Sequence, residues 1–234
     1  MLSELKWESV PNDLMLEFAR KILPHIEEQA CVRAFAARLP FYPDAYRIYR
    51  METSCYDTEK VSGRTEEWFA LWNGAGFPLL INGESGVVHE TNEVAPLALT
   101  PQNTADYLRF FLFCVRGENG AFILLEKQPE KNVPGAEAVA ALTCPLTYIE
   151  QDEDGRARYK ATVAYAGNLY LAYFAVSQDG IVAMTDDELL VTDVPAEAIP
   201  SIRELTDPRI TLMYFPIPAA TAAIEPGEWE FTNM

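Results

Sequence analysis

The stretch TPQNTADYLRFFLFCVRGENGAFILLE, residues 100–126, decides the fold that the sequence predicts. Thr100 suits a helix N-cap, and Pro101 suits the first helical position, where its missing N–H costs nothing. Gly117 stands where a helix commonly ends on a left-handed residue. The apolar side chains in between cover more than half of the helical circumference, which is typical of a helix packed on two sides. The pattern therefore predicts a central buried helix over residues 101–116.

The apolar run AFILL, residues 121–125, follows that helix after a short break and predicts a strand buried on both faces. One narrow strip of the helix is charged instead. Asp106, Arg109 and Arg116 fall on this strip, which could face a ligand, and Arg109 and Arg116 are the candidate binding residues. An ion pair between Asp106 and Arg109, three residues apart, explains the strip equally well.

The aromatic content gives a second set of candidates, with four Trp, eleven Tyr and twelve Phe residues. Trp68 and Trp72 cluster beside a glycine-rich break. Tyr and Trp are enriched where an apolar contact and a polar tip are both needed, as at binding surfaces. We therefore consider Trp68 and Trp72 as binding residues, with core packing as the alternative.

The N-terminal third contains apolar residues at helical spacing. LMLEFARKIL (residues 14–23) and HIEEQACVRAFAARL (residues 25–39), separated by a proline, predict an amphipathic helical pair. Residues 66–72 predict one or two helical turns. Residues 78–82 and 87–90 predict two short strands that flank a hairpin loop.

The C-terminal part, from about residue 144 to residue 185, shows strand alternation. Gly167-Asn168 is typical of a two-residue hairpin turn between two alternating runs. This turn predicts four pairs that share one apolar face: Tyr165 with Tyr170, Val163 with Ala172, Ala161 with Phe174, and Tyr159 with Val176. The opposite face is more polar. Further Asp-Gly turns on both sides complete a four-stranded antiparallel β-meander.

Together these elements predict an α+β fold with an N-terminal helical pair, a central buried helix and a C-terminal antiparallel β-meander. We expect residues 1–234 to form a single domain. Two lobes, residues 1–126 and 136–234, joined by a loop at residues 127–135 (KQPEKNVPG), are the alternative.

Charge limits the class of partner. The chain carries 18 basic and 35 acidic residues, a formal net charge of −17. Neutralising phosphates requires Lys and Arg, so this balance argues against nucleic-acid binding and against anionic membrane surfaces. A basic protein partner fits the charge, and solubility alone explains it as well.

The remaining composition predicts a cytoplasmic location. The four cysteines have no metal-binding or redox spacing, which fits reduced thiols. The N-terminal residues lack the basic and apolar regions of a signal peptide. No apolar run reaches the length of a membrane span.

The catalytic candidates are Ser85, His89 and Glu90. Ser85 with His89 suggests a hydrolase, but Gly86 and Val87 follow the serine, so the G-x-S-x-G elbow and its strand-to-helix context are missing. His89 and Glu90 begin an incomplete H-E-x-x-H zinc motif, on what is predicted to be a strand end. We expect no cofactor.

Two acidic runs imitate metal sites. Glu150-x-Asp152-x-Asp154-Gly155 resembles the start of a calcium loop, but Ala161 stands where a bidentate Glu is required. A solvated hairpin turn explains the run better. Asp186-Asp187-Glu188 is predicted to end a strand in a charged loop. We therefore expect no metal site.

These observations favour a non-catalytic cytosolic binding or regulatory protein that neutralises or chaperones a basic protein partner. A small-molecule, hydrolase-like enzyme with His89 as general base is one alternative. The other is a self-associating structural subunit, a homo-oligomer that uses the polar meander face or an open edge strand.

Overall fold

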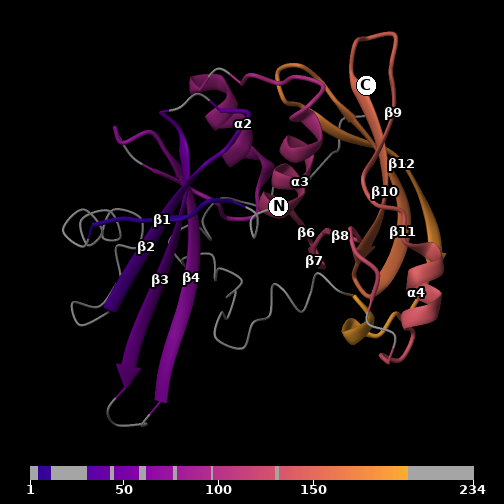
Figure 1. Ribbon diagram of the computed structural model, residues 1–234, viewed down its shortest axis with the longest axis horizontal. Coiled ribbons are helices and arrows are strands. Elements are labelled where there is room, and N and C mark those ends of the chain that lie inside the picture. Colours follow the sequence, from indigo (N-terminus) through magenta and orange to yellow (C-terminus); the bar gives the residue numbers. More distant parts are fainter. Residues whose placement is uncertain are drawn as a thin grey trace.

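The computed structural model describes residues 5–11, 31–42, 45–57, 62–75, 78–95, 97–129 and 132–199. These residues form two five-stranded antiparallel sheets, a two-stranded ribbon and three α-helices. The helices are α2 (Ser85–Val94), α3 (Thr104–Cys114) and α4 (Ala136–Leu142). Figure 1 shows α2 and α3 between the two large sheets, with α4 against the far side of one of them.

The first sheet has the strand order β1-β2-β3-β4-β5. Its strands are β1 (Glu8–Ser9), β2 (Cys31–Arg38), β3 (Arg47–Asp57), β4 (Ser62–Trp72) and β5 (Leu79–Leu80). Three long central strands are therefore flanked by two-residue edge strands. Ile48 lies opposite Ala37 and Leu71 on the face toward the helices, and Met51 lies opposite Ala34 and Trp68 on the other face.

The predicted fold class is wrong, because the structure is mostly β. The part of the predicted N-terminal helical pair that the structure describes is a strand. Residues 31–38, predicted as part of the second helix, are strand β2, and residues 66–72 lie within strand β4. Ala34 and Ala37 are both buried, on opposite faces of the sheet. Burial on both faces puts apolar residues at neighbouring positions, which imitates a helical pattern. The first predicted helix, residues 14–23, lies outside the described residues.

Helix α3 corresponds to the predicted buried helix, although it starts at Thr104 and ends at Cys114. Tyr107, Leu108 and Phe110 are fully buried in it. Its end differs from the prediction. Val115 leaves the helix in an extended conformation, and the chain turns back through a ribbon of β6 (Arg116–Gly117) and β7 (Gly120–Ala121).

Helix α2 replaces the second of the two short strands that were predicted for residues 78–82 and 87–90. Only Leu79–Leu80 of this region is strand, as β5. Val88 and Thr91, three residues apart, are fully buried on the same side of α2. Helical spacing therefore fits the burial, because it brings these two positions to the core together.

The second sheet has the order β12-β11-β10-β8, and β9 also pairs with β10. Its strands are β8 (Ile123–Leu124), β9 (Thr147–Gln151), β10 (Ala157–Tyr165), β11 (Asn168–Val176) and β12 (Val182–Val191). The four C-terminal antiparallel strands agree with the predicted order. The predicted strand at residues 121–125 is shorter and half-buried, as β8 and part of β7.

The register of the β10–β11 hairpin differs from the prediction by two residues. Tyr165 pairs with Asn168, and Val163 pairs with Tyr170. The reason is the turn, since Ala166 and Gly167 are the two residues with positive φ, 51° and 78°, as a type I′ turn requires. A two-residue shift keeps every side chain on its predicted face.

A single hydrophobic cluster contains residues of both large sheets and of the helices between them. The inner face of the second sheet contributes Tyr159, Ala161 and Phe174 to it, and α3 contributes Leu108. On the outer face, Val139 of α4 and its neighbours form a separate small cluster. The outer face is thus partly covered, where the sequence predicted a polar surface.

A short 3₁₀ helix, η2 (Ala196–Ala198), follows the second sheet. Ala198 and Ile199 are buried in the outer cluster beside α4. The predicted loop at residues 127–135 leads into α4, a helix that is not among the predicted elements. Whether this loop separates two lobes stays a prediction.

Candidate functional site

The three catalytic candidates lie on helix α2. Ser85 begins the helix, His89 lies about one turn later and Glu90 is exposed. The His89 ring stacks on Phe111 of α3, with 5.8 Å between ring centroids. Its Nε2 atom is buried and has no hydrogen-bond partner among the described residues. A general base must reach its substrate within hydrogen-bond distance, and this nitrogen faces the protein interior.

Helix α2 also changes the context of two motifs. The prediction that Ser85 lacks a strand-to-helix context is wrong, because β5 is followed by α2, which begins at Ser85. The G-x-S-x-G spacing remains incomplete. His89 lies on a helix, as H-E-x-x-H requires, but Glu93 occupies the second His position. Within the described part of the chain, no group of three or more His, Cys, Asp or Glu residues is arranged to hold a metal ion.

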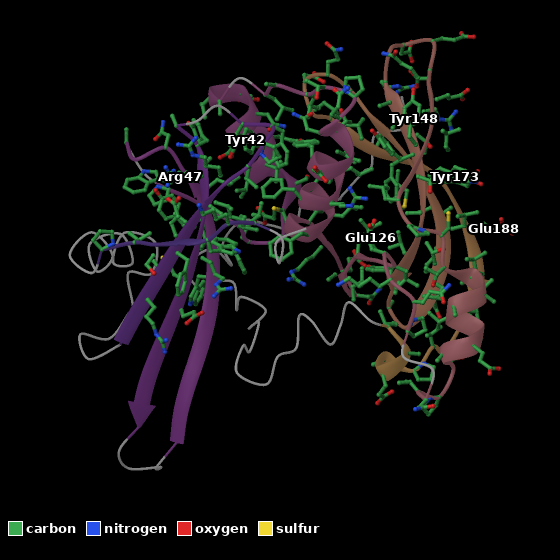
Figure 2. All side chains as sticks on the ribbon, viewed as in Figure 1. Tyr42, Arg47, Glu126, Tyr148, Tyr173 and Glu188 are labelled. Atoms are coloured by element: carbon green, nitrogen blue, oxygen red, sulfur yellow. The ribbon has the colours of Figure 1, made fainter. Side chains whose placement is uncertain are left out.

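Arg109 of α3 is committed to two ion pairs. Its Nη1 lies 3.0 Å from Asp106 Oδ1, and its Nη2 lies 3.2 Å from Glu126 Oε2. The other Glu126 oxygen accepts a hydrogen bond from the Leu146 backbone N–H at 3.3 Å. Glu126 therefore connects α3 to the chain that enters β9, and Figure 2 places it between these elements. On this strip, the charges of Asp106 and Arg109 are therefore used in contacts within the protein.

Arg116 does not share that strip, because it lies in β6, beyond the end of α3. Its backbone N–H donates to the Gly83 carbonyl oxygen at 2.8 Å. The Arg116 side chain lies against Gly83, where an added Cβ would come 3.3 Å from Arg116 Cδ. Arg116 therefore packs near the start of α2, and Arg109 packs against the second sheet.

Trp68 and Trp72 lie on the face of the first sheet that points away from α3. Both pack against a small buried cluster that includes Met51. The Trp72 ring lies 5.6 Å from the Tyr49 ring, and its Nε1 donates to the Ala75 carbonyl oxygen at 2.9 Å. The structure therefore does not bring the four predicted binding residues together in one site.

A buried polar relay was not anticipated from the sequence. The Tyr42 hydroxyl donates to Asn92 Oδ1 at 2.7 Å, and Asn92 Nδ2 donates to the Tyr107 hydroxyl at 2.9 Å. The Tyr107 hydroxyl in turn donates to the Gly180 carbonyl oxygen at 2.6 Å. Burial raises the pKa of both tyrosines, so both stay neutral donors. The relay connects α2, through Asn92, and α3, through Tyr107, with the β11–β12 turn.

In the acidic turn that resembles a calcium loop, the carboxylates form ion pairs with Arg156 of the same turn. Arg156 Nε lies 2.8 Å from Asp152 Oδ2, and Arg156 Nη2 lies 3.0 Å from Asp154 Oδ2. Desolvation acts in the opposite direction, but hydrogen bonds from the Arg156 and Asp154 backbone and from the Arg156 side chain lower the pKa of Asp152. The run forms a hairpin turn in which Arg156 neutralises the carboxylates.

The two sheets differ in charge. Residues 31–80, which hold β2 to β5, contain six acidic and six basic residues, so their net charge is zero. Residues 144–199, which hold β9 to β12, contain ten acidic and three basic residues, a net charge of −7. The acidity of this chain is therefore concentrated in part on the second sheet and its loops.

Strand β12 carries three consecutive acidic residues. Asp186, Asp187 and Glu188 are exposed in the middle of the strand, and no ion pair to them is found among the described residues. Met184 and Leu189, on either side, are 48% and 52% exposed. The prediction that these acids end a strand is wrong, because β12 continues past them to Val191, which pairs with Leu169.

No helix formed by the described residues is long and apolar enough to cross a membrane. Comparison of the chain with protein-family models, with curated proteins and with solved structures gives no match. Function therefore has to be inferred from the chemistry of the surface.

Proposed function

We propose that this chain is a non-catalytic protein that binds a basic protein partner through the acidic surface of its second sheet. The observation that carries the proposal is the exposed row of Asp186, Asp187 and Glu188 on β12. Surface carboxylates without basic neighbours create a negative potential that attracts a positively charged partner and speeds its association.

The ion pairs of the basic side chains in the first sheet support this proposal. In the first sheet, Arg47 pairs with Glu8 at 3.3 Å, and Arg50 pairs with Glu52 at 2.9 Å. Charges there are balanced within the sheet, so they present little net field to a partner. The unbalanced charge of residues 144–199 is left to interact with other molecules.

The position of His89 gives the enzyme alternative less support. The ring packs on Phe111, and no hydrogen bond within the described part of the chain joins it to Ser85 or Glu90. A hydrolase that uses serine requires a hydrogen bond between nucleophile and base in at least its working state. The geometry therefore favours binding over catalysis.

Calorimetric titration of the full chain with a short lysine-rich peptide, and with a glutamate-rich peptide of equal length, tests the proposal. We expect the lysine-rich peptide to bind and the glutamate-rich peptide not to bind. Its affinity should fall as salt is raised beyond physiological strength, where the Debye length is about 8 Å. Absence of binding at low salt would contradict the proposal.

A pair of double variants locates the binding surface. D186K/E188K reverses two charges on β12 and should weaken binding of the lysine-rich peptide. E93K/E118K changes the net charge by the same amount at two exposed positions outside the second sheet. Equal losses in both variants would mean that only the overall charge matters, and the proposed surface would be wrong.

A further inference from the structure

We propose that β12 binds the partner as an added strand: an extended basic segment pairs with the open edge of the second sheet through main-chain hydrogen bonds. This inference rests on the proposed function and specifies how the partner is held. The segment that fits has three consecutive basic residues followed or preceded by an apolar one.

Length and charge together distinguish β12 from the other sheet edges. On the opposite side of the second sheet, β10 is covered by β8 and β9, of two and five residues. In the first sheet, β1 and β5 each pair with two residues of β2 and β4, and the charge of residues 31–80 is balanced. β12 is ten residues long. No backbone hydrogen bond from another described segment reaches its outer side. Such an edge offers unpaired N–H and C=O groups to an incoming strand.

The regular part of this edge is short. β11 and β12 pair without interruption in two stretches: residues 170–173 with residues 186–189, and residues 174–176 with residues 182–184. A register shift separates the two stretches, and another lies between Leu169 and Tyr170. Bulges of this kind twist an edge and end regular pairing. The longer stretch, Asp186–Leu189, contains the three acids and the exposed Leu189, whereas residues 182–184 carry no charge. We therefore place the added strand at the window Asp186–Leu189.

The side chains of this window dictate the partner. Asp186 and Glu188 pair with Tyr173 and Leu171 on the outer face of the sheet. Figure 2 shows Tyr173 and Glu188 on the side away from α3. Asp187 lies on the opposite face. A strand beside them meets a carboxylate at three successive positions, on both faces, so cross-strand pairing favours three successive Lys or Arg residues.

The apolar end of the window completes the pattern. Leu189 is 52% exposed and pairs with Tyr170, so an apolar residue of the partner opposite it would be shielded from water. Within the window, the Asp187 N–H donates to Asp186 Oδ1 at 3.0 Å. An incoming carbonyl oxygen can take over this donor when Asp186 turns to a basic side chain.

The same charges argue against a second copy of this chain as the added strand. A symmetric antiparallel pairing of two β12 edges would place Asp187 near its own copy and Asp186 near Glu188. Like charges directly opposite each other destabilise a strand pair. The acids therefore exclude self-pairing and admit a basic strand.

The test uses two synthetic peptides with the same sequence, containing Leu-Lys-Arg-Lys-Leu between Thr and Val flanks. In one of them, alternate backbone nitrogens are methylated, which removes main-chain donors without changing charge. We expect the unmodified peptide to bind the full chain at least about tenfold more tightly, the effect of one or two lost hydrogen bonds. Hydrogen exchange should show slower exchange of the β12 amides on its binding.

Two double variants provide the matched control. D186K/E188K should weaken binding of the unmodified peptide by about tenfold or more, since both reversed charges would face basic side chains. E153K/E197K makes the same charge change at exposed positions of the same region, away from the β12 edge. It should have a much smaller effect.

The outcomes separate this inference from the proposed function. Equal binding of both peptides, without protection of β12, would overturn strand addition and leave the acidic binding surface in place. Absence of binding by either peptide would overturn both. Equal losses in the two double variants, or dimerisation of the chain through β12 in hydrogen exchange and light scattering, would also overturn strand addition.

Discussion

The two large sheets of this protein differ in net charge and in the length of their edge strands. The first sheet has zero net charge over residues 31–80, ion pairs within and across its strands, and two-residue strands at both ends. The second has a net charge of −7 over residues 144–199 and a ten-residue edge strand. In the first sheet, charges hold the structure together. In the second, many charged side chains are left to the solvent, and this difference is the basis for the binding surface that we propose there.

The largest expected effect tests whether the two sheets depend on the same core. Leu108 of α3 is fully buried in the cluster that both sheets share. Leu108→Asp places an unpaired carboxylate there, which should cost more than about 4 kcal/mol and unfold the protein. Far-ultraviolet circular dichroism during heating checks this. Survival of the second sheet alone would show that the sheets are separate units.

Asp106→Ala is the control on the same helix. The Asp106 side chain is 45% exposed and loses one ion pair with Arg109, which keeps its contact with Glu126. Exposed ion pairs contribute about 1 kcal/mol or less. A loss of stability as large as that of Leu108→Asp would contradict the assignment of these residues to the two sides of α3.

The same contrast explains which elements the sequence could predict. The β10–β11 hairpin was predictable because its faces differ: Tyr159 and Ala161 alternate with the polar Arg158 and Lys160. Alternation of this kind indicates a strand before any partner is known. β2 was not predictable, because the sheet is covered on both faces and its apolar residues do not alternate.

The acids of β12 and the buried polar relay also differed in how far the sequence could predict them. The acids of β12 were visible as a run, but their place within a strand depended on the length of β11 opposite them. The relay from Tyr42 to Gly180 left no signal, because its hydrogen bonds join residues 50, 15 and 73 positions apart. Contacts at such separations depend on the fold, which sequence periodicity does not determine.

A second prediction concerns the turns of the second sheet. Gly180 has φ +84°, and an added Cβ would come within 2.5 Å of Asn92 Nδ2 and Leu97 Cδ2 and 2.7 Å of the Tyr107 hydroxyl. Gly180→Ala should therefore destabilise the protein by about 2–3 kcal/mol, from overpacking and backbone strain together. Chemical denaturation measures this loss.

Gly167→Ala provides the matched control. Gly167 has φ +78°, and nothing lies within 4 Å of an added Cβ. The substitution meets backbone strain alone and should cost about 1 kcal/mol. The difference between the two variants measures how tightly the β11–β12 turn is packed against the helices. Equal losses would mean that the turn is not held by the relay.

A third prediction concerns the relay itself and its pH dependence. Tyr107→Phe leaves Asn92 and the Gly180 carbonyl without their shared partner, and should cost about 2 kcal/mol at neutral pH. Burial raises the pKa of Tyr107 above its unfolded value, so its contribution is complete below about pH 10 and is lost as pH rises further. The variant should therefore lose stability less steeply than the wild type in alkaline solution.

Tyr148→Phe is the control for the loss of a hydroxyl in the second sheet. Tyr148 is 54% exposed, and its replacement should change stability by less than about 0.5 kcal/mol. Thermal melts at neutral and alkaline pH measure both variants. Parallel pH profiles of Tyr107→Phe and the wild type would contradict the role of this buried hydroxyl.

The smallest expected effects compare the charges of the two sheets directly. Arg50 of the first sheet contacts two aromatic rings, with its guanidinium carbon 4.9 Å from the Phe35 ring centroid and 5.5 Å from that of Trp7. Its Nη2 also contacts Glu52 at 2.9 Å. Arg50→Ala loses these contacts together, and should destabilise the protein by about 1–2 kcal/mol.

Arg158 of the second sheet is the comparison. Its Nη1 lies 3.8 Å from Glu150, whose side chain is 58% exposed. A long, exposed pair of this kind contributes little, so Arg158→Ala should change stability by less than about 0.5 kcal/mol. Raising the salt concentration should reduce the small effect of Arg158 further, while that of Arg50 persists because packing is part of it. If Arg158→Ala cost as much as Arg50→Ala, the charges of the second sheet would be structural, and its surface would be less free to bind a partner.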